Sequence, residues 1–219
     1  MTINRETYVA GTILSLILIA LLAGIMLWPS KPELRTLQLL PEPKSLANFN
    51  LEGLQLSQQP DIAGSWVLVY LGFTNCPDIC PLDLQIMANV MKRLRQEEMN
   101  NVKAIFVSVD PERDSLEKIS KYLAYYDEKM IGVSGTHEAL ARTAGFFDAF
   151  YSRTVKTGGK EFLVEAGAAM PAGSGQDYTV NHSARIYVIS PEGQYIGSFA
   201  PPHQADLLYD DLKELVSHF

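Results

Sequence analysis

Residues 66–80 constrain the fold more than any other part of the chain. Residues 66–73 (WVLVYLGF) form a continuous apolar run rich in β-formers, which is typical of a strand buried on both faces. The chain's two cysteines, Cys76 and Cys80, follow directly. Apolar residues then recur every four positions and predict a helix reaching about residue 99, with a stripe formed by Leu82, Ile86, Val90 and Leu94. We therefore expect a strand, a turn that carries both cysteines, and a helix.

A second strand–helix unit follows, with a strand over residues 102–109 and a helix that begins at a capping box formed by Asp114 and Glu117. Glycine-rich residues 152–178 predict an irregular or hairpin-containing insertion. The remaining expected elements are a short strand at 130–133, a helix capped by Thr136 and reaching about residue 150, strands at 184–189 and 194–199, and a last helix over 204–219. This order predicts an α/β domain with a mixed central sheet flanked by helices, compatible with a thioredoxin-like fold.

The N-terminal residues 8–28 contain no charged side chain. As a helix, these residues span about 31 Å, close to the thickness of a bilayer's hydrocarbon core. A cleaved secretion signal is the alternative, but its apolar region is usually shorter and ends at a small-residue cleavage site. The sequence therefore predicts a short tail over 1–7, a transmembrane anchor over 8–28, a proline-containing linker over 29–50 and one domain over 51–219.

The charges near this anchor and over the whole chain restrict the expected cellular location and the expected classes of partner. Only seven residues, including Glu6, precede the anchor, which disfavours an organelle transit peptide and favours a bacterial membrane protein. Basic residues just after the anchor would keep the domain inside, but that rule is weak for large domains. With 18 basic and 25 acidic residues the net charge is −7, so nucleic acid is not an expected partner.

Cys76 and Cys80 are expected to be a reactive pair. Residues four apart at the start of a helix share one face, with Cβ atoms about 5–6 Å apart. This separation allows either a disulfide or joint binding of one metal ion, and the helix N-terminus stabilises a thiolate. Two structural cysteines are the alternative, although a proline-bounded turn containing Asp78 is a poor place for apolar burial. We assign Asp78 itself to a turn role.

Thiolate ligands point to Cu(I), zinc or an iron–sulfur centre. Two cysteines exclude an all-cysteine iron–sulfur site within one chain, and a structural zinc site would need two more ligands. Copper can accept two thiolates and one imidazole, as Cu(I) and after oxidation as Cu(II). His182, between the insertion and a strand, is the candidate third ligand, although a single histidine is more often structural. We interpret the other three histidines as solvated and keep a methionine of the insertion as an open candidate: His137, His203, His218 and Met170.

Three segments in combination, GFTNCPDICP, SVDPERD and NHSARIYVISPEG, resemble the SCO/SenC family of copper proteins involved in cytochrome oxidase assembly. The resemblance covers about residues 51–219, and the spacing in CPDIC differs from the two-residue spacer of ordinary thioredoxin motifs. It implies a thioredoxin-like domain on the periplasmic side of the bacterial cytoplasmic membrane, with copper bound by Cys76, Cys80 and His182. One departure is Asn181, where family members commonly carry aspartate. Asp110 matches the family pattern without an assigned role.

The resemblance favours a copper metallochaperone that delivers copper to the binuclear copper site of a terminal oxidase subunit, by ligand exchange rather than enzymatic turnover. The alternative is a membrane-anchored thiol-disulfide oxidoreductase, in which Cys76 and Cys80 cycle between dithiol and disulfide to act on a partner's cysteines. Other copper chaperones or thiol-disulfide reductases are further expected partners. A sensor and a peroxidase have weaker support in the sequence.

Overall fold

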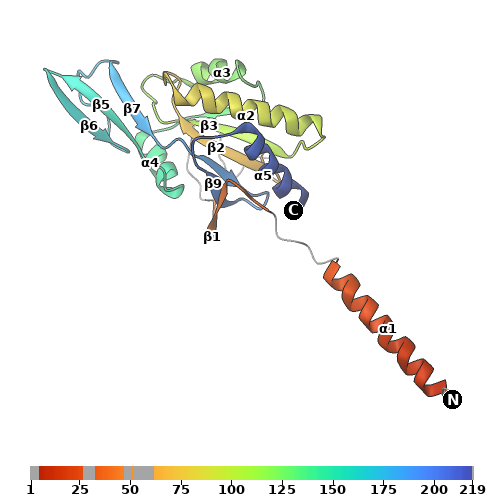
Figure 1. The fold of residues 1–219 in the computed structure, drawn as a ribbon. Coiled ribbons are helices and arrows are strands. Elements are labelled where there is room, and N and C mark those ends of the chain that lie inside the picture. The colour runs from red at the N-terminus through yellow and green to blue at the C-terminus, as the bar shows by residue number, and fades with distance from the viewer. Residues whose placement is uncertain (1–4, 27–32, 47–50, 52–61, 219) are drawn as a thin grey trace.

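The structure is a computed structural model that describes residues 5–26, 33–46, 51 and 62–218 (Figure 1). Its body is a six-stranded sheet, with strands in the order β1-β9-β8-β2-β3-β4. These strands are β1 (Leu37–Ser45), β9 (Gln194–Phe199), β8 (Ile186–Ile189), β2 (Trp66–Gly72), β3 (Val102–Ser108) and β4 (Ile131–Val133). A second sheet has the order β6-β5-β7 and contains β6 (Lys160–Glu165), β5 (Tyr151–Thr157) and β7 (Tyr178–His182). The helices are α1 (Arg5–Met26), α2 (Ile79–Gln96), α3 (Leu116–Ala124), α4 (His137–Phe146) and α5 (Ala205–His218).

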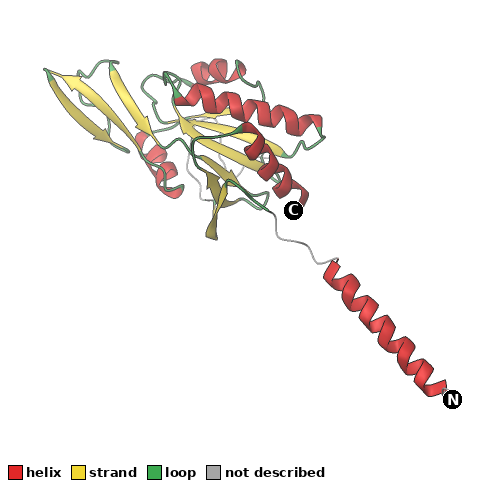
Figure 2. Ribbon diagram, viewed as in Figure 1, coloured by secondary structure: helices red, strands yellow, loops and turns green. Residues whose placement is uncertain are grey.

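The six-stranded sheet is mixed, as predicted. Strand β2 pairs in parallel with β3 and antiparallel with β8. All seven residues of β2 are buried because helices cover both faces of the sheet (Figure 2). Trp66, Leu68 and Tyr70 pack with apolar residues of α2, α3 and α5, whereas the alternate residues of β2 pack with α4 on the opposite face.

Helix α2 begins close to the predicted position, but its buried face differs from the predicted stripe. Leu82 has 57% of its surface exposed, whereas Leu84, Met87 and Met91 are buried together with Val90 and Leu94. A spacing of four residues drifts around a helix that repeats every 3.6 residues, so the first member of such a series leaves the buried face. The predicted stripe is correct only in the second half of the helix.

Two helix starts test the predicted caps. Thr136 accepts a hydrogen bond from the Ala139 N–H and begins α4, as predicted. The predicted cap at Asp114 is wrong, because Ser115 accepts the hydrogen bond from the Lys118 N–H and begins α3. Asp114 is instead buried and binds groups outside the helix. The predicted capping box fails because this carboxylate has stronger donors elsewhere.

The N-terminal helix α1 lies apart from the sheets (Figure 1). Over the part of the chain that the structure describes, no helix has both the length and the apolar character needed to cross a membrane. The structure therefore does not confirm the anchor predicted over 8–28, of which residues 27 and 28 lie outside the described residues.

The predicted linker over 29–50 contains a strand of the main sheet. Strand β1 pairs antiparallel with β9 at the edge of the sheet, with an irregularity between Leu39 and Lys44. Pro41 and Pro43 fall within this irregularity, and an edge strand tolerates proline because one side needs no ladder N–H. The domain therefore starts earlier than the predicted residue 51.

Asp211 of α5 fixes the beginning of β1. This buried carboxylate accepts hydrogen bonds from the backbone N–H groups of Arg35, Thr36 and Leu37, each at 2.8 Å, and from the Thr36 hydroxyl. One carboxylate thus accepts hydrogen bonds from three consecutive N–H groups at the start of β1. This contact joins the two ends of the folded domain.

The segment predicted as an insertion forms the small second sheet, which projects from the body beside α4 (Figure 1). Strands β5 and β6 form the predicted hairpin, with Gly158 and Gly159 at positive φ in its turn. Strand β7 pairs with the other edge of β5 and ends at His182. A hydrophobic cluster of Val155, Val164 and Tyr178 supports the sheet. The β5–β7 sheet therefore carries the predicted histidine ligand toward the main sheet.

Replacing Asp211 with Asn should lower the free energy of unfolding by about 2–4 kcal/mol, because the amide offers one acceptor oxygen and turns its NH₂ group toward backbone donors. Urea unfolding of the full chain measures this loss. Asp210→Asn is the matched control, because Asp210 is half exposed and pairs with Arg35 at 3.5 Å on the surface. It should cost less than about 1 kcal/mol. Equal losses in the two variants would contradict the assigned role of Asp211.

Candidate metal centre

The cysteine turn lies between the end of β2 and the first turn of α2. Cys76 is half-buried and Cys80 is fully buried, and both are free thiols. The Asp78 side chain makes no capping hydrogen bond at the start of α2. Instead, the backbone N–H groups of Asp78 and Cys80 hydrogen-bond the Cys76 sulfur. The helix N-terminus is thus satisfied by a sulfur rather than by a side-chain oxygen.

His182 reaches this turn from the end of β7. Its Nε2 lies 3.3 Å from the Cys80 Sγ, and its ring packs edge-on against the rings of Tyr70 and Phe73. The ligand atoms of Cys76, Cys80 and His182 all lie within 4.8 Å of one another. Among the described residues, no other group of three histidine, cysteine or carboxylate side chains converges in this way. The three side chains predicted as ligands are therefore brought together.

The second nitrogen of His182 fixes how the ring can act. Nδ1 lies 3.1 Å from the Ser183 carbonyl oxygen, which can only accept a hydrogen bond. In the neutral ring the proton therefore lies on Nδ1, and the Nε2 lone pair faces the sulfurs. A backbone carbonyl that binds one ring nitrogen is the common partner of a metal-ligating histidine.

The two sulfurs have different proton affinities. A hydrogen bond from Cys80, aided by the N–H groups of the turn and opposed by burial, lowers the pKa of Cys76 to about 3. The same contact with Cys76 and the burial of the sulfur raise the pKa of Cys80 above its ordinary value. Without metal, Cys76 is therefore a thiolate and Cys80 a thiol at neutral pH.

Gly72, at the end of β2, makes room for the Cys80 sulfur. A Cβ atom at this position would lie 2.8 Å from Sγ of Cys80 and 2.8 Å from the Phe106 ring. Any larger residue would therefore displace the sulfur or the ring. The sequence shows only a glycine between apolar residues, so its contact with Cys80 becomes visible only once the strand and helix are packed.

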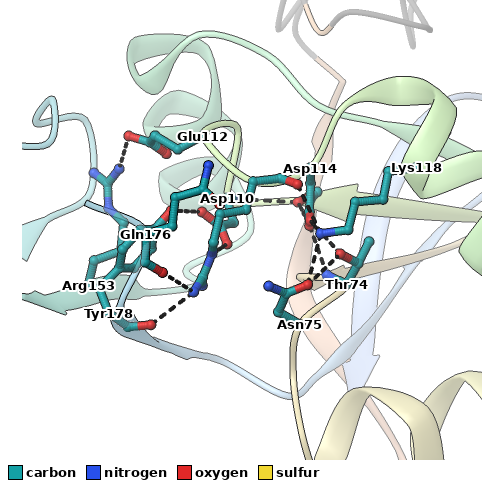
Figure 3. A network of polar contacts seen from close by, with 11 residues as sticks. Thr74, Asn75, Asp110, Glu112, Asp114, Lys118, Arg153, Gln176 and Tyr178 are labelled. Carbon is teal, nitrogen blue, oxygen red and sulfur yellow. Dashed lines mark hydrogen bonds and ion pairs between the residues drawn. The ribbon is translucent and has the colours of Figure 1, made fainter. Parts of the chain in front are cut away.

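Asp114 ties the cysteine turn to the SVDPERD segment (Figure 3). Its buried carboxylate accepts a hydrogen bond of 2.8 Å from the Thr74 N–H, a second from the Thr74 hydroxyl and one of 2.6 Å from the Ser108 hydroxyl. Lys118 binds the carboxylate at 3.1 Å and reaches the Asn75 side chain at 2.8 Å. The two residues that precede Cys76 are therefore held from the loop after β3.

Arg113 ties the same segment to β7. Its guanidinium binds Asp110 at 2.5 Å, donates to the Tyr178 carbonyl at 3.0 Å and lies over the Tyr178 ring. The Tyr178 hydroxyl in turn donates to Asp110. Asp110, unassigned from the sequence, thus helps to place the strand that carries His182. The SVDPERD segment therefore holds the cysteine turn on one side and the histidine strand on the other.

The other candidate residues lie outside this cluster. His203 and His137 were predicted to be solvated and are not: the His203 side chain is buried against Asp83, and His137 binds Glu112. Sequence spacing could not reveal these contacts, because the partners lie 120 and 25 residues away. Met170 packs against the small hydrophobic cluster of the β5–β7 sheet.

Asn181 and Asp78 are exposed, and Asn181 points to the opposite side of β7 from His182 because side chains alternate along a strand. Asn181 therefore offers no ligand to the cluster. The prediction for the His218 side chain lies outside the described residues.

Two sulfurs and one imidazole nitrogen form a soft donor set with three members. Such a set fits copper, whereas a structural zinc site would require a fourth ligand that no described residue supplies at this position. The adjacent sulfurs could also exchange between dithiol and disulfide. The geometry thus supports both chemistries predicted from the sequence.

In the reduced, metal-free protein, iodoacetamide should modify Cys76 at a rate that stays nearly constant from pH 8 down to about pH 5. The thiolate is lost only as the pH falls through its lowered pKa of about 3. For an ordinary thiol with a pKa near 8.5, the modification rate falls roughly tenfold for each pH unit below that value. Mass spectrometry of labelled peptides separates the two cysteines. The urea-unfolded chain is the control, and identical profiles for folded and unfolded protein would contradict the assignment.

Asp114→Asn should loosen the cysteine turn, because the amide loses the charge that holds the Thr74 N–H and hydroxyl. Backbone hydrogen exchange in a peptide covering residues 73–80 should become roughly tenfold faster. Glu117→Gln is the matched control, since Glu117 pairs with Lys121 on the exposed side of α3. Unchanged exchange in Asp114→Asn would show that the turn is held by other contacts.

Comparisons with known sequences identify relatives of this chain. The model of the SCO1/SenC family matches residues 47–217. The chain is 31% identical over 160 residues to "Protein SCO2 homolog, mitochondrial" of Bos taurus, covering 73% of this chain and 54% of that protein. It is 31% identical over 140 residues to "Protein SCO1 homolog, mitochondrial" of Homo sapiens, covering 64% and 41%. The chain spans about half the length of the curated relatives it matches.

Solved structures give the same relationship. Apo Sco1 of Thermus thermophilus matches with a TM-score of 0.66 and 30% identity, over 85% of this chain and 99% of that chain. Arabidopsis thaliana ScoI with copper bound matches with a TM-score of 0.60 and 28% identity, over 80% and 98%. Yeast Sco1 with copper bound matches with a TM-score of 0.61 and 25% identity, over 82% and 90%. These matches confirm the predicted thioredoxin-like fold, and the family model, which covers most of the chain, shows that it belongs to the SCO1/SenC family.

Proposed function

We propose that this protein is a copper metallochaperone that delivers copper to the binuclear copper site of a terminal cytochrome oxidase. The observation that carries the proposal is the convergence of the Cys76, Cys80 and His182 ligand atoms within 4.8 Å. The relatives from Arabidopsis and yeast were solved with copper bound. The resemblance to the SCO/SenC family supplies the oxidase as the receiving partner.

The donor set can serve copper in two oxidation states. Two thiolates satisfy Cu(I), and the imidazole nitrogen adds a donor that Cu(II) also accepts. The lowered pKa of Cys76 provides one thiolate before metal arrives. Cys80 releases its proton on binding, so uptake of the metal is coupled to the loss of one proton at this sulfur.

The unequal burial of the two sulfurs gives transfer a direction. Cys76 lies half-exposed at the open side of the turn, whereas Cys80 is enclosed by Gly72 and the rings above β2. An approaching thiolate of the partner can reach a metal on the Cys76 side while Cys80 and His182 still hold it. Transfer then proceeds by exchange of one ligand at a time, without free metal.

The location forms part of the proposal. The uncharged N-terminal segment would anchor the chain in the bacterial cytoplasmic membrane, with the copper domain on the periplasmic side. Such a position would place the domain beside a membrane-bound oxidase subunit. Other copper chaperones or thiol-disulfide reductases would load the domain or keep its cysteines reduced.

The second candidate function is thiol-disulfide exchange with the cysteines of a partner. The closeness of the two sulfurs, which lie within 4.8 Å of each other, and the thiolate character of Cys76 favour it. The two functions differ at His182, because thiol exchange needs the cysteines alone whereas copper binding also uses the imidazole.

The reduced full chain should bind one equivalent of Cu(I) in competition with a chromophoric chelator. Cys76→Ser and Cys80→Ser should abolish this binding, and His182→Ala should weaken it at least about tenfold, as expected for loss of one of three ligands. His137→Gln is the control, because this histidine lies outside the cluster. Absence of copper binding by the reduced wild-type chain would reject the proposal in favour of thiol exchange. If His182→Ala reduced copper transfer and thiol exchange equally, separate roles would be rejected.

A further inference from the structure

Three buried polar side chains form a hydrogen-bonded chain beside the cysteine pair, and none of the three is a predicted ligand. The Tyr70 hydroxyl donates to Oδ2 of Asp83 at 2.9 Å, and Oδ1 of Asp83 lies 2.8 Å from Nδ1 of His203. The His203 and Asp83 side chains are only 1% and 2% exposed, and Tyr70 is completely buried. This Tyr70–Asp83–His203 chain is therefore shielded from solvent along its whole length.

Its members come from three separate elements. Tyr70 lies in β2, Asp83 lies in α2 one turn after Cys80, and His203 precedes α5. Burying a carboxylate is costly even when it is hydrogen-bonded, and apolar side chains of the same size often serve stability as well. The rest of this hydrophobic cluster is almost entirely apolar. The placement of a carboxylate and an imidazole beside the cysteine pair therefore suggests a role at that pair.

Tyr70 connects the chain to Cys80. Burial raises the pKa of Tyr70 above its ordinary value, and the nearby Cys80 sulfur raises it further. A Cβ atom at Gly72 would lie 2.8 Å from the Cys80 Sγ and 3.2 Å from a carbon of the Tyr70 ring, so the sulfur and the ring lie beside the same point of β2. The phenol proton thus has two possible acceptors, the sulfur and the carboxylate.

His203 decides how strongly Asp83 competes for that proton. Its second nitrogen, Nε2, lies 3.4 Å from the Phe199 carbonyl, so both ring nitrogens face oxygen acceptors. The imidazole that hydrogen-bonds Oδ1 takes up part of the acceptor capacity of the carboxylate. Asp83 therefore orients the phenol through Oδ2 but leaves its proton available to Cys80.

We propose that the Tyr70 hydroxyl hydrogen-bonds the Cys80 sulfur, positions it and favours the reduced pair over the disulfide. Asp83 competes for the phenol proton, and His203 limits that competition. A thiol or thiolate sulfur is a hydrogen-bond partner for the phenol, whereas a disulfide sulfur is a much weaker one. The contact therefore stabilises the dithiol, the form that can receive copper. This inference deepens the proposed function. Its relevance to copper rests on that function, whereas the effect on the dithiol does not.

The test measures the equilibrium between dithiol and disulfide in the metal-free full chain. Dithiothreitol transfers two electrons and one proton to the Cys76–Cys80 disulfide, which becomes the Cys76 thiolate and the Cys80 thiol. Dithiothreitol closes into its own cyclic disulfide, and its second proton is released to solvent. Titration across dithiothreitol redox ratios, followed by thiol trapping and mass spectrometry, gives the equilibrium constant for reduction. No copper is present, so the result does not depend on metal binding.

Tyr70→Phe should lower this constant about tenfold, equivalent to about 30 mV for a two-electron couple. Tyr187→Phe is the matched control, because Tyr187 is also completely buried, lies on the neighbouring strand and packs on the opposite face of the sheet. It should leave the constant within about twofold. A change in Tyr70→Phe no larger than in Tyr187→Phe overturns the proposal.

The other two members should shift the constant in opposite directions. His203→Gln removes the imidazole that hydrogen-bonds Oδ1 of Asp83, so the carboxylate holds the phenol proton more strongly and the constant falls. Asp83→Asn weakens the competing acceptor, so the constant rises severalfold, and this rise should vanish in the Tyr70→Phe background. A purely structural role predicts that all variants shift the same way, in step with their loss of thermal stability. That outcome, or a rise that persists without the Tyr70 hydroxyl, overturns the assignment of Asp83 and His203.

A separate readout links the positioning role to copper. In the Cu(II)-loaded chain, loss of the hydrogen bond in Tyr70→Phe makes the Cys80 sulfur a stronger donor, so the sulfur-to-copper absorption band should move to lower energy. An unmoved band would exclude an effect of Tyr70 on the metal-bound sulfur. If the chain binds no copper while the metal-free constants follow the expected pattern, the proposed function fails and the positioning role stands.

Discussion

The hydrogen bonds of Asp114 hold together parts of the chain that sequence alone would leave free to move. The carboxylate takes the N–H and hydroxyl of Thr74, the hydroxyl of Ser108 and the ammonium of Lys118. A buried charge is tolerated only when donors surround it, so the cysteine turn and the loop after β3 must be in place together. Arg113, the preceding residue, extends the same loop to β7. One short segment therefore determines the distance between the cysteines, which lie in the turn after β2 and the start of α2, and the histidine, which lies in the second sheet.

The two cysteines of this site differ in burial and in the polarity of their surroundings. Cys76 faces the N–H groups of the turn and keeps a thiolate, whereas Cys80 lies among apolar rings where a charge is costly. A symmetrical pair would offer a metal ion the same number of donor atoms, but the ion would have no preferred side from which to leave. The difference follows from one turn of helix, since the first sulfur precedes α2 and the second lies inside its first turn. The unequal donors are thus a direct result of where the helix begins.

Structural features that depend on local periodicity can be predicted from the sequence, whereas features that depend on packing between distant segments cannot. The buried strand β2, the helix after it and the reactive pair follow from residues 66–96, because each signal lies within a few turns of chain. Residue patterns alone make His182 only a candidate, and the resemblance to the SCO/SenC family makes it the expected third ligand, because no local pattern marks its approach to the turn. Strand β1 was missed because an edge strand containing Pro41 and Pro43 has the composition of a linker. The roles of Asp114 and His203 were also missed, because their partners lie 40 and 120 residues away.

The missed residues share a physical character. Asp83, Asp114, Asp211 and His203 are polar groups buried by contacts between distant segments, and each is satisfied by specific donors or acceptors. Such groups contribute little net stability compared with apolar replacements, but a misplaced segment leaves them unpaired at a large cost. They therefore penalise alternative arrangements of β1, the cysteine turn and the segment before α5. In a site whose ligands come from a turn and from a separate sheet, this penalty keeps the donor atoms at the separation that a single metal ion requires.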